Sequence, residues 1–438
     1  MSFNLPDLPE DWTYAPLDSL SHPNSVTYGV VQPGAALEVG KPLIRVNNFR
    51  DTRIDLTDVM YIAPEIEAKY SRTRLKGGEV LITIVGSVGQ VAVVPSQLCG
   101  FNVARAVAVI HPLPHIAPEW IALCLRSPLS QHLLGSRANT TVQTTINLKD
   151  LRALPVPLPP VKVRHAISDF VGALDDRITL LRETNATLEA IAQALFKSWF
   201  VDFDPVRAKM EGRAPEGMDE ATAALFPDSF EETELGVVPR GWRVATLHDC
   251  CKKIESGGTP KRTVPEFWNG SISWLTSGEV RNPIVFDTKE KITEGGVTGS
   301  SAKLWPAGTT VVAMYGATAG EVCLIASPMT ANQACCGLIP QDNFRAFLFF
   351  CARREREDLA SKSSGSAQQN LNKGLVEQHQ VIRPTNGVVA AFEMTIGTML
   401  NRWIESELHA QTLSTLRDTL LPRLISGQLQ LPGDADEN

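Results

Sequence analysis

The sequence predicts an α+β protein in which two pseudo-symmetric globular modules are each followed by a long helix, the two helices pairing as an antiparallel coiled coil. Three observations predict this arrangement. Short motifs recur in the same order after an offset of about 230 residues. Heptad-spaced apolar residues follow each copy of the motifs. The chain of 438 residues is also too long to bury its apolar side chains in one core.

The duplication is visible in four pairs of segments. They are residues 9–12 with 239–242, 44–48 with 274–278, 77–94 with 307–325, and 143–147 with 368–372. The offset is 230 residues for the first two pairs and 225 for the last. Because all four pairs keep their order along the chain, we interpret the sequence as an internal two-fold repeat.

Each copy begins with short apolar runs separated by glycine, such as residues 80–84 and 91–94, which indicate β-strands. Prolines at 155–160 and at Pro384 then mark the start of a long helix. We therefore predict six segments along the chain. They are a first module (1–155), a helix (156–203), an acidic, irregular connector containing Pro and Gly (204–240), a second module (241–384), a second helix (385–432) and a tail (433–438).

The first helix carries a regular seam of residues at alternating spacings of four and three. Its members are Ile167, Val171, Leu174, Ile178, Leu181, Asn185, Leu188, Ala192, Leu195 and Trp199. Asn185 is the only polar member, and a buried amide at such a position fixes the register of paired helices. The core of an ordinary helical bundle is the alternative interpretation, but so long a seam favours coiled-coil pairing.

The second helix has a less regular seam, which Ser406 and Arg417 interrupt. Its members are Phe392, Ile396, Met399, Trp403, Ala410, Leu413, Leu420 and Leu424. The two seams supply our candidates for helix pairing or partner docking. Helices of about 35 to 40 residues span roughly 50 to 60 Å, so we expect the pair to hold the two modules apart.

The formal net charge of −7 lies entirely in residues 156–235, which carry 8 Lys and Arg against 15 Asp and Glu. The segments on either side are neutral, so each module can present a basic surface. No apolar run reaches the ~18 residues that cross a membrane. The N-terminal residues MSFNLPDLPEDW are unlike a secretory signal. We expect a cytoplasmic protein with no membrane partner.

The sequence shows no catalytic or metal-binding motif. GxxxxGKS/T, GxGxxG, GxSxG and HExxH are absent, as is the Asn-Pro-Pro-Tyr tetrapeptide of amino-methyltransferases. Asp228 with Asp287 and Lys289 matches a nuclease pattern only superficially. The eight cysteines form no CxxC pair and we interpret them as reduced and mostly buried. His111 and His115 lie in a proline-bent loop, where a loop or capping role is favoured over a metal.

Three segments carry a family resemblance. Residues 187–212 (TLEAIAQALFKSWFVDFDPVRAKMEG) and 226–243 (FPDSFEETELGVVPRGWR) resemble the central conserved region of specificity (S) subunits of type I restriction–modification systems, and 416–429 (LRDTLLPRLISGQL) resembles their distal conserved region. Residues 255–262 (ESGGTPKR) and the Gln-x-x-(Ile/Leu)-Asn motifs ending at Asn147 and Asn372 are similar to parts of their target recognition domains. The resemblance covers nearly the whole chain.

The resemblance implies a non-catalytic subunit of an adenine-N6 DNA methyltransferase or type I restriction endonuclease complex. The two modules would be target recognition domains, each reading one half of a bipartite, asymmetric double-stranded DNA target. The paired helices would set the spacing of the halves and dock two modification subunits. It implies no cofactor bound by this chain: S-adenosylmethionine is expected in the modification subunits, and ATP with Mg in two restriction subunits where these join.

Base reading requires side chains that reach the edges of DNA bases, such as Arg for guanine and Asn or Gln for adenine. With the resemblance, two polar loops of the first module are predicted to contact DNA. Their candidates are Arg45, Asn47, Asn48 and Arg50 in the first loop, and Arg137, Asn139, Thr140, Thr141, Gln143 and Thr145 in the second. For each residue, turn formation or solvated surface is the alternative role.

In the second module, Gly257 and Gly258 open a loop that we predict to be flexible and basic. The candidate DNA contacts are Thr259, Lys261 and Arg262 in that loop, Thr276 and Ser277, Tyr315 and Thr318 at a glycine turn, and Lys362, Ser363, Gln368, Gln369 and Asn370. The glycine turns themselves favour a structural role. Asn147 and Asn372 are shared by both copies, which indicates a structural role at the end of each module.

Two other classes of function are compatible with the residues alone. One is a duplicated helical scaffold that binds protein partners without reading DNA. Salt-dependent duplex binding that requires partner subunits distinguishes it from a DNA-reading subunit. The other is an autonomous nuclease or methyltransferase, which requires metal- or cofactor-dependent turnover by the isolated chain.

Overall fold

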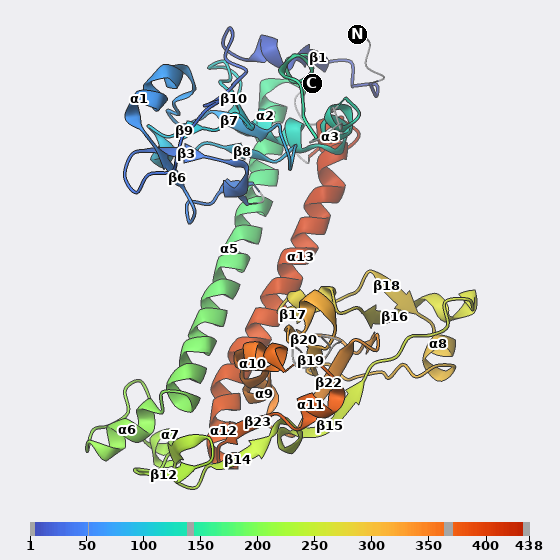
Figure 1. The fold of residues 1–438 in the computed structure, drawn as a ribbon. Coiled ribbons are helices and arrows are strands. Elements are labelled where there is room, and N and C mark those ends of the chain that lie inside the picture. Colours follow the sequence, from blue (N-terminus) through green and yellow to red (C-terminus); the bar gives the residue numbers. More distant parts are fainter. Residues whose placement is uncertain (1–4, 51, 138–143, 363–370, 432–438) are drawn as a thin grey trace. The chain divides into compact units, whose positions relative to one another are not determined.

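The computed structural model describes residues 5–50, 52–137, 144–362 and 371–431. The chain divides into two compact units, unit 1 with residues 1–178 and 412–438 and unit 2 with residues 179–411. Each unit contains one β-rich module together with one part of each long helix (Figure 1). The predicted α+β class with two modules and long helices is confirmed, although the boundaries of the compact units fall inside the helices.

The first module is built around an antiparallel sheet. Its strands, in order across the sheet, are β2 (Thr27–Tyr28), β10 (Val107–Ile110), β7 (Val80–Thr83) and β8 (Val91–Val93). Alternate residues of β7 face opposite sides. Val80 and Ile82 pack in the cluster that contains helix α2 (Pro118–Arg126), whereas Leu81 packs with Phe49. The sheet is buried on both faces, so an unbroken apolar run forms its central strand.

Smaller elements complete this module. They are a three-stranded sheet of β6 (Met60–Ile62), β3 (Lys41–Ile44) and β9 (Asn102–Val103), the pair β4 (Phe49–Arg50) and β5 (Arg53–Ile54), and helices α1 (Pro64–Glu67), α3 (Pro128–Gly135) and α4 (Leu148–Arg152). Glu67 of α1 is buried and accepts hydrogen bonds from Arg74 Nε at 2.8 Å and from Asn102 Nδ2 at 3.1 Å. This network fastens α1 to β9.

The second module repeats the plan with longer strands. Its main sheet has the order β15 (Cys251–Ser256), β22 (Cys335–Pro340), β19 (Thr310–Ala313), β20 (Val322–Ile325) and β17 (Ile284–Val285). Its smaller sheet has the order β18 (Glu290–Ile292), β16 (Trp268–Leu275) and β21 (Thr330–Ala331). Its helices are α8 (Glu294–Thr298), α9 (Arg345–Arg354), α10 (Arg356–Ser361) and α11 (Lys373–Glu377). α9 packs in the same core cluster as Val312 and Leu324 of the main sheet.

The first and last strands of each module pair with each other. In the first module β1 (Thr13–Pro16) runs antiparallel to β11 (Pro155–Leu158). In the second, β14 (Arg243–Thr246) runs antiparallel to β23 (Gln380–Arg383). The turn before each first strand is also repeated, because Trp12 N donates to Pro9 O and Trp242 N donates to Pro239 O, both at 3.0 Å. These turns bear out the predicted internal repeat.

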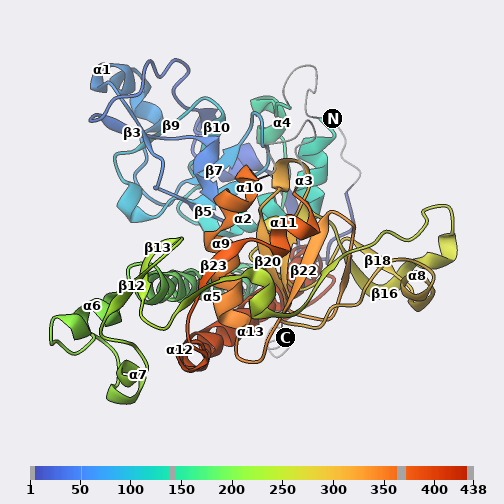
Figure 2. The same ribbon diagram turned by 60° about the horizontal axis from the view of Figure 1, so that its bottom comes forward.

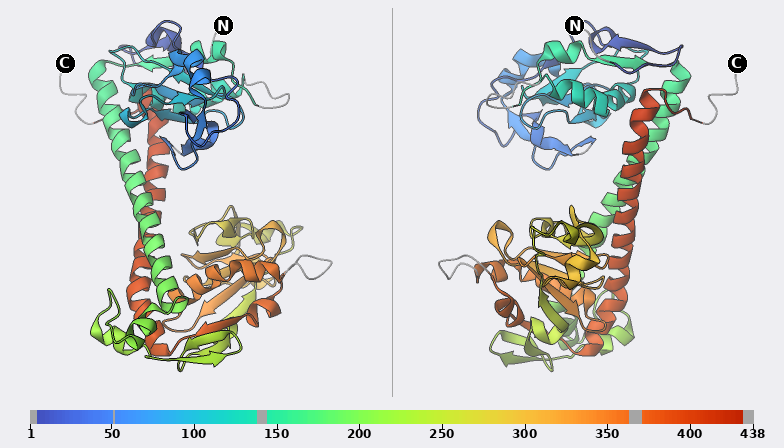
Figure 3. Two further views of the ribbon diagram at one scale, coloured as in Figure 1. Left: turned by 60° about the vertical axis from the view of Figure 1, so that its left-hand side comes forward. Right: turned by 90° about the vertical axis from the view of Figure 1, so that its right-hand side faces the viewer.

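The long helices are α5 (Val161–Phe200) and α13 (Thr398–Ile425), the latter preceded by α12 (Asn386–Phe392) and a π-helical turn at Glu393–Gly397. Every residue of the predicted α5 seam is buried or half-buried. The helices lie side by side within each unit (Figure 3). They run antiparallel, since in unit 1 Ile167 and Val171 share a cluster with Leu421 and Leu424.

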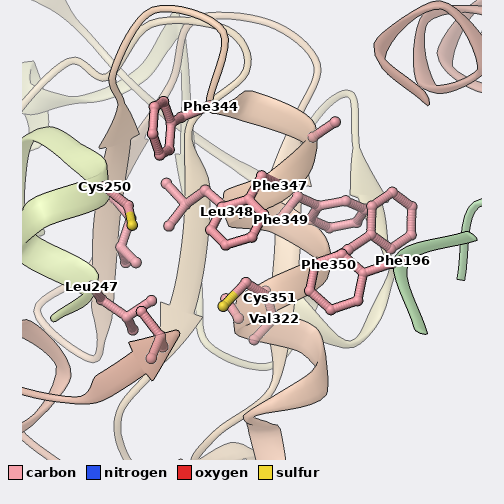
Figure 4. Packing of buried hydrophobic residues seen from close by; sticks show 14 of the residues in the cluster. Phe196, Leu247, Cys250, Val322, Phe344, Phe347, Leu348, Phe349, Phe350 and Cys351 are labelled. Atoms are coloured by element: carbon pink, nitrogen blue, oxygen red, sulfur yellow. The ribbon is translucent and has the colours of Figure 1, made fainter. Parts of the chain in front are cut away.

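In unit 2 the contact between the helices and the second module is aromatic. The ring of Phe196 on α5 lies 5.9 Å from Phe347 and 6.3 Å from Phe350 of α9, and 6.0 Å from Phe392 of α12. Figure 4 shows Phe196 meeting the α9 side chains, with Leu247 and Cys250 on the opposite side of the same helix. Burying such rings contributes more than their area alone, because tilted and edge-to-face pairs are favourable.

Polar side chains belong to the helix contact instead of interrupting it. In unit 1 the carboxylate of Asp175 accepts hydrogen bonds from Arg417 Nη1 at 2.7 Å and from Arg126 Nη1 of α2 at 2.9 Å. In unit 2 Asn185 is buried and its Nδ2 donates to Glu407 Oε2 at 3.0 Å, while Ser406 is buried as well. Our interpretation of Ser406 and Arg417 as breaks in the seam was wrong, because a small or charge-paired side chain fits the contact.

The connector is more regular than we predicted. It contains helices α6 (Asp204–Met210) and α7 (Glu220–Ala224) and a hairpin of β12 (Phe230–Thr233) and β13 (Gly236–Pro239), visible together in Figure 2. Phe203 anchors it, because its ring lies 5.7 Å from Trp242. The irregular structure expected from Pro, Gly and acidic residues is replaced by short elements held by this aromatic contact.

Candidate nucleic-acid interface

The first predicted loop, residues 45–50, is partly used for its own structure. Asn48 is buried: its Oδ1 accepts from Arg45 N at 2.8 Å, and its Nδ2 donates to Asp55 O and Asp58 O. Asp58 also binds Arg45 Nη2 at 3.0 Å and Asn47 Nδ2 at 2.8 Å. Asn48 therefore shapes the loop, while the carboxylate of Asp58 occupies part of the hydrogen-bonding capacity of Arg45 and Asn47.

An open pocket of about 550 Å³ lies beside this loop in the first module. It is lined by Arg45, Val46, Asn47, Phe49, Arg50, Ser87, Gln90, Ala104 and Ala106. The loop therefore meets the glycine turn between β7 and β8, as well as the residues that precede β10. Gly86 and Gly89 have φ of 81° and 87°, which only glycine adopts readily, so these residues are needed for the turn itself.

The second predicted loop reaches the same turn. Gly86 N donates to Thr144 O at 3.0 Å, and Val85 forms an isolated bridge with Thr145. Both predicted loops of the first module therefore converge on one glycine turn. Arg137 is half-buried at the end of α3. Four further predicted contacts lie outside the described residues: Asn139, Thr140, Thr141 and Gln143.

The loop at 257–262 in the second module is firmly held, contrary to the predicted flexibility. Gly257 N donates to Cys335 O at 2.9 Å and Gly258 N to Ala331 O at 2.8 Å. A Cβ on Gly257 would lie 2.2 Å from Asn332 O, so close backbone packing requires glycine there. Thr259 hydrogen-bonds Gln333, and Lys261 is exposed.

Arg262 is fixed by two kinds of contact. Its Nη2 donates to Glu290 Oε2 at 2.9 Å, and its guanidinium lies 3.8 Å from the centre of the Trp268 ring. Hydrogen bonding to Glu290 raises the pKa of Arg262 and lowers that of Glu290. The residue remains half-exposed, so it presents a pre-oriented cation at the surface.

Two of the remaining candidates of the second module, Tyr315 and Thr318, lie at its glycine turn. Tyr315 is exposed, whereas Thr318 is buried and donates to Tyr315 O at 3.2 Å. Leu371, the first described residue after the last predicted loop, donates its N–H to Met314 O. Lys362 Nζ lies 2.7 Å from His379 Nδ1. Ser363, Gln368, Gln369 and Asn370 lie outside the described residues.

The loop after Ile44 in the first module and the loop after Leu275 in the second match position by position, once the predicted offset between them is corrected. Ile44 ends β3, which pairs in parallel with β9, and Leu275 ends β16, which pairs in parallel with β21; the two residues lie opposite Val103 and Ala331. The following residue is capped in both copies: Arg45 N donates to Asn48, and Thr276 N donates to Glu279 Oε2 at 2.9 Å. The offset here is thus 231 residues, so our pairing of Ile44 with Trp274 was wrong by one.

The shared asparagines are helix caps. Asn147 Oδ1 accepts from Lys149 N at 2.9 Å at the start of α4, and Asn372 Oδ1 accepts from Leu375 N at 3.0 Å at the start of α11. An asparagine at this position satisfies a backbone donor that has no partner within the helix. Both residues therefore have the structural role that we predicted.

Most seam residues of the two helices are buried or half-buried against other protein atoms. Some apolar side chains outside the seams are exposed on the helices and the π-helical turn. They are Val161, Leu180, Ile191, Met394, Leu408 and Leu416. Sequence reasoning missed them because they lie outside the heptad pattern that defines helix pairing.

Other candidate chemistry is sparse in the described part of the chain. All eight cysteines are free, and only Cys99 is exposed. No group of three or more His, Cys, Asp or Glu side chains among the described residues is arranged to hold a metal ion. His111 lies 3.7 Å from Glu79 Oε1, and burial lowers the pKa of the histidine. None of the described helices has the length and apolar character needed to cross a bilayer.

Comparison with known proteins identifies the family to which this duplicated chain belongs. The type I restriction–modification DNA specificity domain matches the chain twice, over residues 32–190 and 239–388. The chain belongs to this family. The two matches to this specificity domain fall on the two copies of the internal repeat. The first begins in the first module and the second at Pro239, at the end of the connector hairpin, and each ends in the helix that follows the module.

Individual specificity subunits are similar over long parts of the chain. The type I restriction enzyme HindI specificity subunit of Haemophilus influenzae is 29% identical over 410 residues, which cover 82% of this chain and 88% of the relative. The EcoBI specificity subunit of Escherichia coli is 36% identical over 198 residues, covering 43% and 42%. The type I S subunit from M. genitalium shares the fold, with a TM-score of 0.60, 14% identity and coverage of 97% and 98%.

Proposed function

We propose that this specificity subunit reads a bipartite, asymmetric DNA sequence, with one half recognised by each module. The observation that supports this most directly is that the two modules share the same backbone framework but carry different surface residues at matching positions. The same caps and glycine turns recur in both modules, yet Arg45 and Asn47 of the first correspond to Thr276 and Gly278 of the second. Arg and Asn offer hydrogen-bonding groups that differ from that of Thr, and Gly offers no side-chain group at all. The two half-sites should therefore differ.

Net charge is compatible with this role when it is considered by segment. The two modules are neutral overall, and exposed cations such as Arg50, Lys261 and Arg262 lie on predicted DNA-contacting loops. The acidic connector would be repelled by phosphates and is expected to face away from DNA. Much of the phosphate contact would then come from partner subunits.

The partners in this proposal are two modification subunits, which dock on the exposed apolar residues of the helices. S-adenosylmethionine would be bound by these subunits, and ATP with Mg by restriction subunits where they join. This chain would contribute recognition and no catalytic group. A duplicated scaffold that binds only proteins is not favoured, because the matching family is one of DNA specificity domains.

The test is co-expression of the chain with a modification subunit of its own system, followed by single-molecule sequencing of host DNA for N6-methyladenine. We expect one split motif with two different halves. Copurification of the subunits without any motif would refute DNA reading and leave helix docking intact. A symmetric motif would refute the assignment of unequal half-sites to the two modules.

A further inference from the structure

The pocket beside the glycine turn of the first module contains side chains whose hydrogen-bonding groups are unused. Among the described residues, no partner hydrogen-bonds the side-chain amide of Gln90 or the hydroxyl of Ser87. The side chain of Arg50 is exposed and, among the described residues, forms a long ion pair of 3.6 Å with Asp55. These three residues come from two separate segments of the chain and line one pocket.

The other polar residues of the pocket are already engaged. Arg45 and Asn47 both bind the carboxylate of Asp58, at 3.0 Å and 2.8 Å. Of the two side-chain amides that line the pocket, that of Asn47 is hydrogen-bonded to Asp58. That of Gln90 has no hydrogen-bond partner among the described residues and is free to bind a ligand. Neither amide atom of Gln90 is among the buried side-chain atoms without a partner in the described part of the chain, so both are open to water or a ligand.

The backbone of Gln90 is rigidly positioned. Gln90 N donates to Thr83 Oγ1 at 2.9 Å, and Gln90 O accepts from Thr83 N at 2.9 Å. Thr83 Oγ1 in turn donates to Ser87 O at 2.6 Å. The turn is thus tied to strand β7 on both sides of Gln90, so its side chain starts from a fixed point at the end of the buried sheet. Rigid placement of this kind is what discrimination between bases requires.

The equivalent position of the second module is occupied differently. Glu321 follows Gly320 as Gln90 follows Gly89, and Ala313 N donates to Glu321 O as Thr83 N donates to Gln90 O. Glu321 carries a carboxylate that pairs with Arg356 Nη1 at 3.3 Å. At this position, therefore, the first module has an available amide where the second has a paired carboxylate.

We propose that Gln90 is a specificity-determining residue that reads one adenine in the half-site of the first module. A carboxamide matches the adenine edge in the major groove, because its NH₂ donates to N7 while its oxygen accepts from the N6 amino group. Arg50 at the rim is placed for the neighbouring phosphate, and Ser87 for an adjacent base or phosphate. This inference rests on the proposed function, since it assigns part of the DNA contact to this pocket.

The test compares the methylation motif of Gln90→Ala with that of Gln97→Ala, each in complex with the modification subunit. Gln97 is an exposed glutamine of the same module outside the pocket, so its variant should keep the wild-type motif. In Gln90→Ala, discrimination for adenine at one position of one half-site should fall by about 10- to 100-fold. The other half-site and the spacer should not change. An unaltered motif in Gln90→Ala would overturn the proposal.

A second measurement uses the wild-type complex and does not depend on folding of a variant. Replacing each adenine of the target in turn with 7-deazaadenine removes its N7 acceptor. One position in the first module's half-site should lose about tenfold in affinity. If no adenine of that half-site is sensitive, Gln90 does not read adenine. Absence of any motif in the wild type would instead refute the proposed function itself.

Discussion

Replacing Asp175 with asparagine removes the charge on which two arginines of unit 1 converge. Arg417 Nη1 lies 2.7 Å from Asp175 Oδ1, and Arg126 Nη1 lies 2.9 Å from Oδ2. The asparagine keeps one acceptor but turns an NH₂ donor toward the other guanidinium. We expect this change to weaken the attachment of α2 and the end of α13 to α5.

The magnitude follows from the burial of the three side chains. A hydrogen bond to a charged group contributes about 1.5–3 kcal/mol, and breaking a fully buried ion pair costs about 3–5 kcal/mol. The side chain of Asp175 is 14% exposed and those of Arg126 and Arg417 are 22% and 19% exposed, so water screens part of the interaction. We expect a loss of about 2–3 kcal/mol, which corresponds to a roughly 30- to 150-fold larger equilibrium constant for local opening.

Hydrogen exchange of the full chain, followed by mass spectrometry, measures this opening in peptides from α2 and the end of α13. Asp176→Asn is the matched control. Its carboxylate is 81% exposed and pairs with Arg53 at 3.3 Å, so its loss should cost at most about 1 kcal/mol. If exchange in Asp175→Asn is no faster than in Asp176→Asn, the three-way pairing does not hold these elements together.

Three further predictions follow from individual contacts. Asn147→Ala and Asn372→Ala should each lower stability by about 1 kcal/mol in thermal melts while the methylation motif stays unchanged; an altered motif would show base reading. Hydrogen bonds from Arg74 hold the pKa of Glu67 below its ordinary 4.5, so their stabilisation is present above that pH and lost as pH falls through the folded-state value. Urea melts of Glu67→Gln should lack this acid dependence. Thiol labelling of the folded chain should modify Cys99 first, since the other seven cysteines are buried; fast labelling of several thiols would contradict this burial.

The features that sequence predicted well are those encoded by local pattern. The seam from Ile167 to Trp199 predicted burial because one face of a helix repeats every three to four residues. Gly86 and Gly316 predicted turns because glycine adopts positive φ readily. In the structure their φ angles are 81° and 67°. The shared motifs ending at Asn147 and Asn372 indicated equivalent structural positions, which proved to be helix caps.

The features that sequence could not predict depend on residues far apart in the chain. Arg417 appeared to break the seam, because its partner Asp175 is 242 positions away. Asn48 looked like a base reader, but Asp55 and Asp58 fold back to accept its hydrogen bonds. Gln90 belonged to no recognisable motif, and the availability of its amide became apparent only when the engaged side chains around it were known.

The antiparallel pairing of first and last strands has a consequence for how such proteins change over generations. Thr13 lies opposite Leu158, and Arg243 lies opposite Arg383, so each module leaves the scaffold and returns to it at neighbouring positions on paired strands. Recombination within these strands could exchange an entire module without altering the helices. New combinations of half-sites would then arise by shuffling whole modules, with no need for gradual mutation of each loop.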